Sequence, residues 1–238
     1  QGLEQMKSLE ERYSHGVLEK QMEALRIDAS KNCGAFLGTY GNCKLNSIQY
    51  LDDGDILKLQ ISIKDGYSEF DFSGTSQSRE DNLNATEAIT LSAVCYCLRV
   101  LIGKELPLNE GLLEPISLII PPGSILSPDF SGKAQDCPGV AGGNVEISQK
   151  VVDLILNAFQ QVACSQGTMN NISFGNQSFS HYETIGGGSG AMIGQNGTSA
   201  VQVHMTNTAI TDPEILESSF PLRLLACKVR DSSGGSGT

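Results

Sequence analysis

Apolar and polar residues alternate most regularly over residues 56–64, and this alternation predicts a β-strand with one buried face. The apolar members, which we expect to face a core, are Leu57, Leu59, Ile61 and Ile63. Asp53-Gly54 precedes the strand and Asp65-Gly66 follows it, and both dipeptides favour tight turns. Phe70 and Phe72 continue the alternation in the next strand, so this part of the chain is predicted to form an antiparallel meander.

Two segments change to a helical spacing. Residues 86–102 are apolar on nearly all sides, which is typical of a buried helix, and Gly103 is suited to its C-terminal cap. A second helix is predicted after Asn144, with an apolar stripe made of Val151, Leu154, Ile155, Ala158, Phe159 and Val162. Residues 2–26 predict a more polar helix with one apolar face, which Gly16 bends or interrupts.

Shorter elements complete the expected fold. Short strands and turns are predicted over 31–44, further strands over 116–120, 200–206 and 221–230, and a helical turn from Asp212 onward. Strands and helices do not alternate as regular βαβ units. We therefore predict an α+β fold, with mixed or antiparallel sheets, two buried helices and loops rich in Gly and Asn. We divide the chain into an N-terminal helical segment, residues 1–30, and an α+β domain, residues 31–238.

The composition and net charge limit the kinds of molecule that are expected to bind this protein. The chain of 238 residues is 39% hydrophobic and 18% charged, which is typical of a globular protein. Its net charge of −11 repels nucleic acid and anionic membranes, so we expect neither as a partner. Seven cysteines without tight spacing indicate reduced thiols and a cytoplasmic location. Since the chain begins with Gln1, we expect it to be a fragment of a longer protein.

Four segments carry more hydroxyl, amide and glycine residues than packing requires. In residues 71–76, Asp71 and Ser73 could bind an anion or a substrate carboxylate. The alternative is a strand-to-helix loop with Asx and Ser/Thr turns. In residues 142–146, two glycines before Asn144 resemble a phosphate cradle, although no Gly-Lys-Ser/Thr follows. The alternative, which the pattern favours, is an Asn N-cap after a tight turn.

The third and fourth segments supply the other candidates. Gln166, Asn170 and Asn171 offer uncharged donors and acceptors that suit an amide or imide ring, or else they form a loop at a helix end. The three glycines of residues 186–188 let the backbone approach another group closely. The general acid/base candidates here are Glu183 and His204, and Asn207 is a further binding candidate. The alternatives are a flexible loop, a surface Glu and a satisfied strand His.

The three histidines, His15, His181 and His204, are far apart and show no metal-ligand spacing. We therefore predict no complete metal site within this chain.

Together the motifs resemble the hydantoinase B/5-oxoprolinase family, from about residue 45 to the end. In chain order they are DFSGTS, NLNA, PLNEGLLEPI, PPGSILSP, GGNVEISQKVVD, SQGTMNN, YETIGGGSGA, HMTNTAITDPEILE and SGGSG. The last segments are most similar to the 5-oxoprolinase branch, and N-methylhydantoinase is next. The large subunits of acetone and acetophenone carboxylases are more distant relatives. Residues 134–140 (AQDCPGV) depart from the small apolar run that is usual before the GGN motif.

The resemblance implies an ATP-dependent enzyme that hydrolyses a cyclic amide. An ATP-binding partner similar to hydantoinase A, using ATP and Mg²⁺, phosphorylates the amide oxygen, and the B half acts on the phosphorylated lactam. Water then opens the ring, which requires a base for water and donors for the phosphate. The family's metal-binding His and Asp residues lie upstream of this segment. The expected partners are therefore the A-like subunit, the rest of the B chain and further copies in an oligomer.

Two other functions stay open at this point. One is the large subunit of an ATP-dependent ketone carboxylase, which uses the same activation of an oxygen atom. The other is a non-catalytic scaffold or assembly fragment that lacks the metal-bearing segment.

Overall fold

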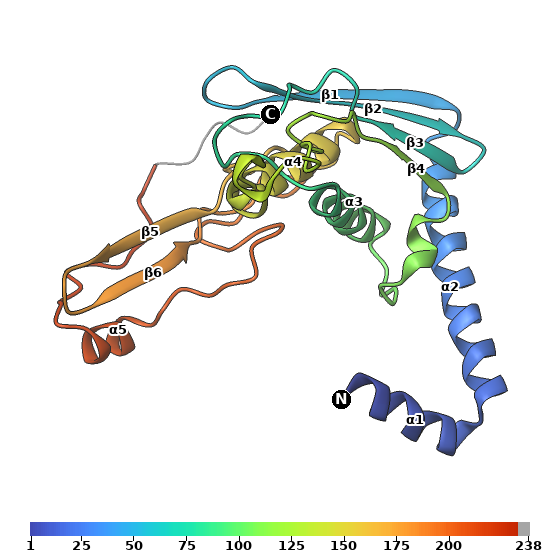
Figure 1. Ribbon diagram of the computed structural model, residues 1–238, viewed down its shortest axis with the longest axis horizontal. Coiled ribbons are helices and arrows are strands. Elements are labelled where there is room, and N and C mark those ends of the chain that lie inside the picture. The colour runs from blue at the N-terminus through green and yellow to red at the C-terminus, as the bar shows by residue number, and fades with distance from the viewer. Residues whose placement is uncertain (233–238) are drawn as a thin grey trace. The chain divides into compact units, whose positions relative to one another are not determined.

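The computed structural model describes residues 1–232 and has the predicted α+β fold (Figure 1). The SGGSG motif at 233–237 lies outside the described residues. The helices are α1 (Gly2–Tyr13), α2 (His15–Gly38), α3 (Glu87–Ile102), α4 (Ser148–Ala158) and α5 (Pro213–Ser219). The strands are β1 (Cys43–Tyr50), β2 (Ile56–Lys64), β3 (Tyr67–Asp71), β4 (Ile116–Ile119), β5 (Asn170–Gly175) and β6 (Ser180–Ile185).

The chain forms two compact units, and each unit is assembled from separate pieces of sequence. The first unit contains residues 1–45, 60–71 and 98–119. The second unit contains residues 46–59, 72–97 and 120–238. Strand β2 and helix α3 each begin in one unit and end in the other. The predicted division into residues 1–30 and 31–238 stays a prediction.

A mixed four-stranded sheet confirms the strands expected from the alternating pattern. Its order is β1-β2-β3-β4, with β2 and β3 antiparallel and β3 and β4 parallel. The four apolar side chains of β2 that were expected to face the core are all buried. Asp65 and Gly66 both have positive φ, 52° and 79°, as a two-residue type I′ turn requires.

Helix α2 is longer than the sequence pattern predicted. It continues through Gly38, so the short strands and turns expected over 31–44 are wrong for residues 31–38. The reason is a buried stripe of Ala29, Cys33 and Leu37, four residues apart, which the nearby Gly34 and Gly38 obscured. The interruption expected at Gly16 lies at Ser14 instead, where φ is 64° and α1 ends.

The two core helices differ in how completely they are buried. On α4, residues on every side are buried, including Val151, Leu154 and Ile155. A π-helical turn, Gly143–Ile147, leads into α4. Helix α3 buries Val94 and Leu98 on one face, whereas Leu91 and Val100 remain exposed. Gly103 follows α3 with a φ of 64°, which confirms it as the C-terminal cap.

The strands predicted over 200–206 and 221–230 are absent from the described structure. In the first segment Ala200 and His204 have positive φ, 55° and 58°, and extended backbone cannot contain such residues. The second segment pairs with no strand, and its apolar Leu225 and Val229 are exposed.

A hairpin of β5 and β6 was missed because its residues do not alternate between apolar and polar. Asn170 pairs with Ile185 at one end, and Gly175 pairs with Ser180 at the turn. The ring of Phe220, directly after α5, lies 5.5 Å from the ring of Phe179 in the turn of this hairpin. Asp212 caps α5 by accepting a hydrogen bond from the Glu214 amide, which confirms the helical turn predicted there.

Candidate functional site

A buried histidine lies between a carboxylate and a phenol in the second unit. His204 Nε2 is 3.4 Å from Oδ1 of Asp153 on α4, and His204 Nδ1 is 3.2 Å from the hydroxyl of Tyr96 on α3. The backbone amide and hydroxyl of Ser165 both donate to the Asp153 carboxylate, at 2.9 and 3.1 Å. The side chains of His204 and Asp153 are only 8% and 3% exposed, so these polar groups face each other instead of solvent.

Gln149 fixes the backbone on both sides of this histidine. It lies one helical turn before Asp153, so both side chains project from the same face of α4. Its Nε2 donates to Thr206 Oγ1 at 2.7 Å and to the Val203 carbonyl at 3.4 Å. Because Gln149 is buried, these bonds hold His204 in its left-handed backbone conformation.

The SQGTMNN loop is attached to the start of the same helix. Thr168 Oγ1 donates to Glu146 at 2.5 Å, and the Met169 amide donates to the Val145 carbonyl at 2.8 Å. Within the loop, Asn170 Nδ2 donates to Gln166 Oε1 at 2.9 Å. The structure thus brings two predicted binding residues, Gln166 and Asn170, into direct contact.

The glycines at 186–190 approach the protein's own chain. A Cβ atom on Gly187 would overlap with the Gln166 side chain, and one on Gly190 would overlap with the Ala163 carbonyl. A Cβ on Gly186 would make a tight contact of 3.0 Å with the Val201 carbonyl carbon. The predicted close approach is therefore confirmed, and at Gly187 it is made to the loop that carries Gln166 and Asn170.

The β5–β6 hairpin separates the remaining candidates onto two faces. Asn171 and Thr184 form a cross-strand pair, and Thr184 Oγ1 donates to Asn171 Oδ1 at 2.7 Å. Glu183 points to the opposite face because side chains alternate along a strand. There Glu183 Oε2 accepts a hydrogen bond from the Thr211 amide at 3.0 Å and lies 3.6 Å from His181 Nε2.

The surroundings of Glu183 favour its carboxylate form. Burial on its own raises the pKa of Glu183, but hydrogen bonds from Thr211 and the nearby His181 outweigh it, so the net pKa is lowered. A carboxylate with a lowered pKa is a weaker base, and its bond to Thr211 anchors the segment before α5. The acid/base role of Glu183 stays a prediction.

The first two polar segments are occupied by hydrogen bonds within the protein. Thr75 Oγ1 accepts from the Lys58 amide at 3.1 Å, and Ser76 Oγ accepts from the Ile56 amide at 3.0 Å, so these hydroxyls extend the edge of β2. Asp71 ends β3 in the first unit. Ser73 follows in an exposed turn of the second unit.

The Gly142-Gly143 pair packs against residues 82–85, with no room for a Cβ at either position. Between these segments, buried Asn84 donates to three carbonyls, those of Arg79, Asp81 and Gly139, and accepts from the Arg79 amide. The Asn N-cap favoured at residue 144 is wrong, because Asn144 lies inside the π-helical turn, where no side chain caps the helix. The turn is closed by its backbone and by contact with residues 82–85.

The structure therefore gathers some of the predicted residues and leaves others apart. Gln166 and Asn170 bond to each other, and His204 faces Asp153 on α4. Asn144 and Asn207 are exposed, as Asn170 is, and take no part in these contacts. Sequence reasoning missed Tyr96, Gln149, Asp153 and Ser165. The one available signal was Asp153, a single carboxylate in the otherwise apolar run from Val151 to Leu156.

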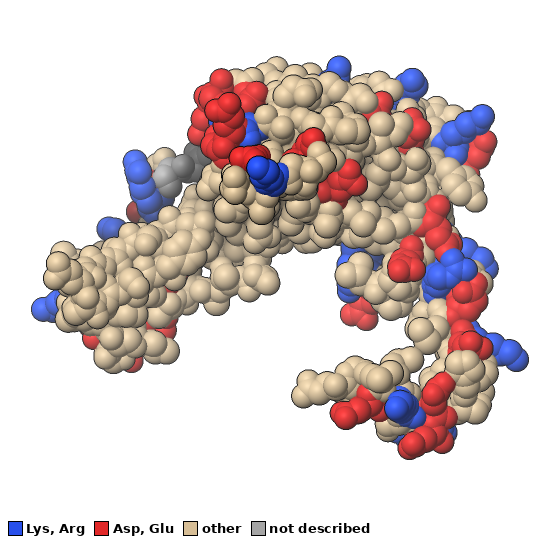
Figure 2. Space-filling model, in the orientation of Figure 1, with Lys and Arg blue, Asp and Glu red and all other residues tan. Residues whose placement is uncertain are grey.

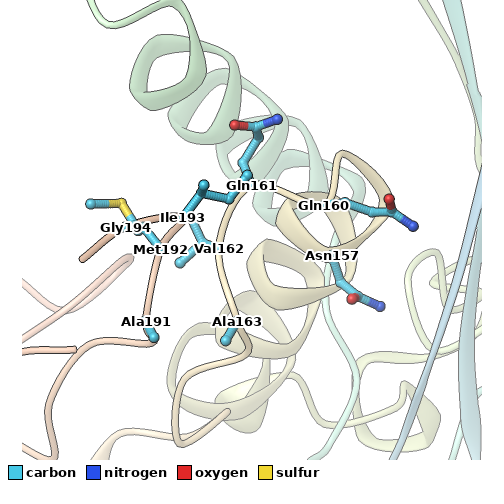
Figure 3. Close-up of a pocket in the computed structure, with 9 residues that line it drawn as sticks. All are labelled: Asn157, Gln160, Gln161, Val162, Ala163, Ala191, Met192, Ile193 and Gly194. Atoms are coloured by element: carbon cyan, nitrogen blue, oxygen red, sulfur yellow. The ribbon is translucent and has the colours of Figure 1, made fainter. Parts of the chain in front are cut away.

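A cavity of about 540 Å³ lies at the other end of α4. It is lined by Asn157, Gln160, Gln161, Val162, Ala163, Ala191, Met192, Ile193 and Gly194 (Figure 3). The lining contains amide and apolar side chains but none of the predicted site residues. Figure 3 shows that the side chains of Gln160 and Met192 point away from one another. The cavity is therefore a separate feature from the His204 cluster.

The distribution of charged side chains, of metal-ligating groups and of long apolar helices describes the surroundings of the site. Figure 2 shows charged side chains gathered over α1 and α2, whereas the β5–β6 hairpin is mostly uncharged. Among residues 1–232, no group of three or more His, Cys, Asp or Glu is placed to hold a metal ion. Within the same residues, no helix combines the length and apolar character needed to cross a membrane.

Comparison with known proteins places these features in a family. A family model described as hydantoinase B/oxoprolinase matches residues 1–238. The chain is 44% identical over 252 residues to 5-oxoprolinase 1 of Arabidopsis thaliana, an alignment that covers 99% of this chain. It covers 19% of the plant protein, so the chain spans about a fifth of that relative's length.

Two solved structures have a similar fold. An ATP-dependent caprolactamase from Pseudomonas jessenii matches with a TM-score of 0.75 and 18% identity, over 93% of this chain and 41% of that one. A nucleotide-free acetone carboxylase matches with a TM-score of 0.62 and 16% identity, over 80% of this chain and 29% of that one. The match of the family model to the whole chain, supported by the close plant relative, shows that this chain belongs to the hydantoinase B/oxoprolinase family.

Proposed function

We propose that this chain is part of an ATP-dependent cyclic-amide hydrolase of the 5-oxoprolinase or N-methylhydantoinase type. In this proposal it belongs to the B half, which acts on the phosphorylated lactam. The observation that carries the proposal is the 44% identity, over almost the whole chain, to a protein named 5-oxoprolinase 1.

The reaction needs a proton acceptor and then a proton donor. Water adds to the ring carbon of the phosphorylated lactam while a base takes its proton. The C–N bond then breaks as a proton reaches the departing nitrogen, and a second water releases the phosphate from the resulting acyl phosphate. A group that accepts a proton in the first step and returns it in the second serves both needs.

His204 is the acid/base group that the geometry supports best. Its ring lies between a carboxylate and a hydroxyl, and its backbone is held at a φ of 58°, which is uncommon for a residue other than glycine. Sparsely populated backbone conformations of this kind concentrate at functional sites. In contrast, the carboxylate of Glu183 is engaged by the Thr211 amide.

The amide groups of Gln166 and Asn170 are suited to orienting a cyclic amide. They are uncharged, they can both donate and accept, and they sit in a loop fixed to α4 and to Gly187. Asp71, Ser73, Asn144, Asn171 and Asn207 remain candidates for contacts with the substrate or with the rest of the protein.

The same proposal includes partners outside this chain. A hydantoinase A-like subunit or domain would bind ATP and Mg²⁺ and perform the phosphorylation. The rest of the B chain would hold any divalent metal, because residues 1–232 offer no such group. We further propose a cytoplasmic oligomer that binds neither nucleic acid nor a membrane.

The test is ATP-dependent release of glutamate from 5-oxoproline by the complete natural protein with its ATP-using half. We expect His204→Asn to lower kcat by about 100-fold or more, as for a lost acid/base group. His15→Asn, an exposed histidine on α2, is the matched control and should leave kcat unchanged.

Three outcomes would change the proposal. ATP use with hydantoins instead of 5-oxoproline would change the substrate and keep the reaction class. ATP use with ketones and bicarbonate would replace hydrolysis by carboxylation. If none of these substrates is turned over, the result would favour a non-catalytic scaffold.

A further inference from the structure

The His204 cluster contains the parts of a proton relay that extends beyond the histidine itself. Three elements supply them: Tyr96 from α3, Asp153 from α4, and His204 from the segment that Gln149 holds in place. All three residues belong to the second compact unit. The order of the groups, phenol, imidazole and carboxylate, follows from the two ring nitrogens of His204 facing different partners.

The partners determine which ring nitrogen carries the proton. A carboxylate only accepts hydrogen bonds, so Asp153 favours a hydrogen on His204 Nε2, 3.4 Å away. This distance is longer than a full hydrogen bond, and among the described residues Nε2 has no hydrogen-bond partner, so Asp153 is the acceptor that faces it. The other nitrogen, Nδ1, is then left with a lone pair, and the Tyr96 hydroxyl at 3.2 Å donates to it.

The remaining titratable groups near Asp153 are neutral. Burial raises the pKa of the Cys97 thiol, and the Asp153 charge raises it further. The same two causes raise the pKa of Cys164. Burial also raises the pKa of the Tyr96 phenol, so it carries its proton at neutral pH. Ser165 donates a hydrogen bond to each of the two Asp153 oxygens.

The three members differ in their access to the surface. The side chains of Asp153 and His204 are almost fully buried, whereas Tyr96 is half-buried. Of the three side chains, that of Tyr96 is therefore the most exposed. We propose that Tyr96, His204 and Asp153 form a proton relay in which Tyr96 exchanges the proton with the substrate and Asp153 positions the His204 ring.

The relay rests on the hydrolase function proposed above and assigns its proton transfers. As water attacks the ring carbon, its proton moves to the Tyr96 oxygen while the phenol proton moves to His204 Nδ1. Asp153 stabilises the resulting imidazolium, as the acidic member of a catalytic triad does. When the C–N bond breaks, the proton returns by the same path to the departing nitrogen, and the relay ends in its original state.

A second histidine–carboxylate pair lies in the β5–β6 hairpin, and it has aromatic rings where the first pair has the Tyr96 hydroxyl. His181 Nε2 lies 3.6 Å from Glu183, a spacing close to that of His204 and Asp153. The His181 ring is flanked by Phe174 and Phe220, with ring centroids 5.1 and 5.0 Å away. Aromatic rings cannot carry a proton onward, so this pair packs the hairpin against the segment after α5.

The test uses the complete natural protein with its ATP-using half and two nearly isosteric variants. Tyr96→Phe removes one hydroxyl from a half-buried side chain, and Asp153→Asn removes the buried charge. The matched controls are Tyr182→Phe, at an exposed position of β6, and Asp52→Asn, in the exposed turn before β2.

Two readouts are needed, because an inactive variant alone does not separate a relay from a structural role. The first is the pH dependence of kcat/KM for ATP-dependent turnover. The second is the titration midpoint of His204, measured by peptide-resolved deuterium exchange at its ring carbon, which needs no activity.

The expected results differ between the two variants. Tyr96→Phe should lower kcat by about 100-fold while KM changes only a few-fold. Asp153→Asn should lower kcat by about 10³- to 10⁴-fold, as when the orienting carboxylate of a triad is replaced. It should also move the His204 midpoint and the acid limb of kcat/KM together, because the charge that faces the ring is removed.

Several results would overturn the relay. One is retained kcat in Tyr96→Phe, and another is a His204 midpoint that does not move in Asp153→Asn. A third is a moved midpoint with an unchanged pH profile, because that combination indicates a structural pair. If the wild-type protein turns over no substrate, the hydrolase proposal fails, and the His204 midpoint still decides whether Asp153 positions the ring.

Discussion

The side chain of Gln166 occupies the space that a Cβ atom on Gly187 would fill. Gln166 and Gly187 are 21 residues apart, and their contact joins two motifs, the SQGTMNN loop and the glycine-rich segment after β6. Glycine is required at position 187 because only a residue without a side chain leaves room for the Gln166 amide. The position of one candidate binding group therefore depends on the absence of atoms at another residue.

Gly187→Ala should lower turnover more than stability. The methyl group would displace the far end of the flexible Gln166 side chain and break its hydrogen bond with Asn170. We expect kcat/KM for the cyclic amide to fall by about 10-fold, since loss of one orienting hydrogen bond is worth about 1.5 kcal/mol. Gly190→Ala is the informative comparison, because its methyl would meet the Ala163 backbone, which cannot swing aside. That variant should lose local protection from hydrogen exchange, and equal effects of both variants would contradict the steric explanation.

Asn84→Ala should destabilise the loop that links residues 79–84 to Gly139. Removing the buried amide leaves three carbonyls and one amide without partners, which we expect to cost about 2–4 kcal/mol in local opening free energy. Asn84→Asp should be worse, because a carboxylate offers only acceptors to three carbonyl oxygens. Peptide-resolved hydrogen exchange measures the local opening free energy in both variants. Asn82→Ala, at an exposed side chain, is the control. An equal loss of opening free energy at positions 82 and 84 would contradict a stabilising role for the Asn84 amide.

The Glu183–Thr211 contact should weaken in acid. Because the folded-state pKa of Glu183 is lowered from 4.5, its contribution to stability is present above pH 4.5 and is lost as the pH falls below that value. Hydrogen-exchange protection of the residues around Thr211 should therefore be retained at and above pH 4.5 and decrease as the pH is lowered further below that value. Glu183→Gln should abolish that dependence, whereas Glu214→Gln, at an exposed position, should retain it.

Cys97 should resist alkylation in the folded protein. It is fully buried, its Sγ faces the Val152 carbonyl at 3.8 Å, and burial raises its pKa, so neither access nor thiolate is available. Iodoacetamide labelling followed by peptide mass spectrometry should find Cys97 unmodified at times when Cys227, which is exposed, has reacted. Labelling at equal rates would show that the core around α4 opens readily.

The fold was predictable where one physical signal was strong. Alternation identified β2, apolar character on nearly all sides identified α3, and an apolar stripe at helical spacing identified α4. The hairpin of β5 and β6 was not predictable, since residues such as Asn171 and Thr184 pair through polar groups and leave no apolar period. Likewise, the alternating residues 200–206 suggested a strand, but the fixed contacts of His204 and Thr206 with α4 determine the backbone there.

The candidate site was less predictable than the fold. His204 was identifiable because histidine is a common acid/base residue. Asp153 and Tyr96 sit in helices that read as core, and only the folded chain shows that both face the same ring. The glycines were correctly expected to allow a close approach. Their neighbours in the protein, Gln166 and Ala163, could not be named from the sequence.

The interleaving of the two compact units has a consequence for how this protein can change over evolution. The boundaries fall after residues 45, 59, 71, 97 and 119, so no single cut of the chain separates the two units. A contiguous stretch of the gene that encodes all of the first unit, such as residues 1–119, also encodes residues 46–59 and 72–97 of the second. Neither unit can therefore be exchanged by itself in one piece, and substitutions within loops such as 165–170 and 186–190 offer a route to new specificity that leaves both units whole.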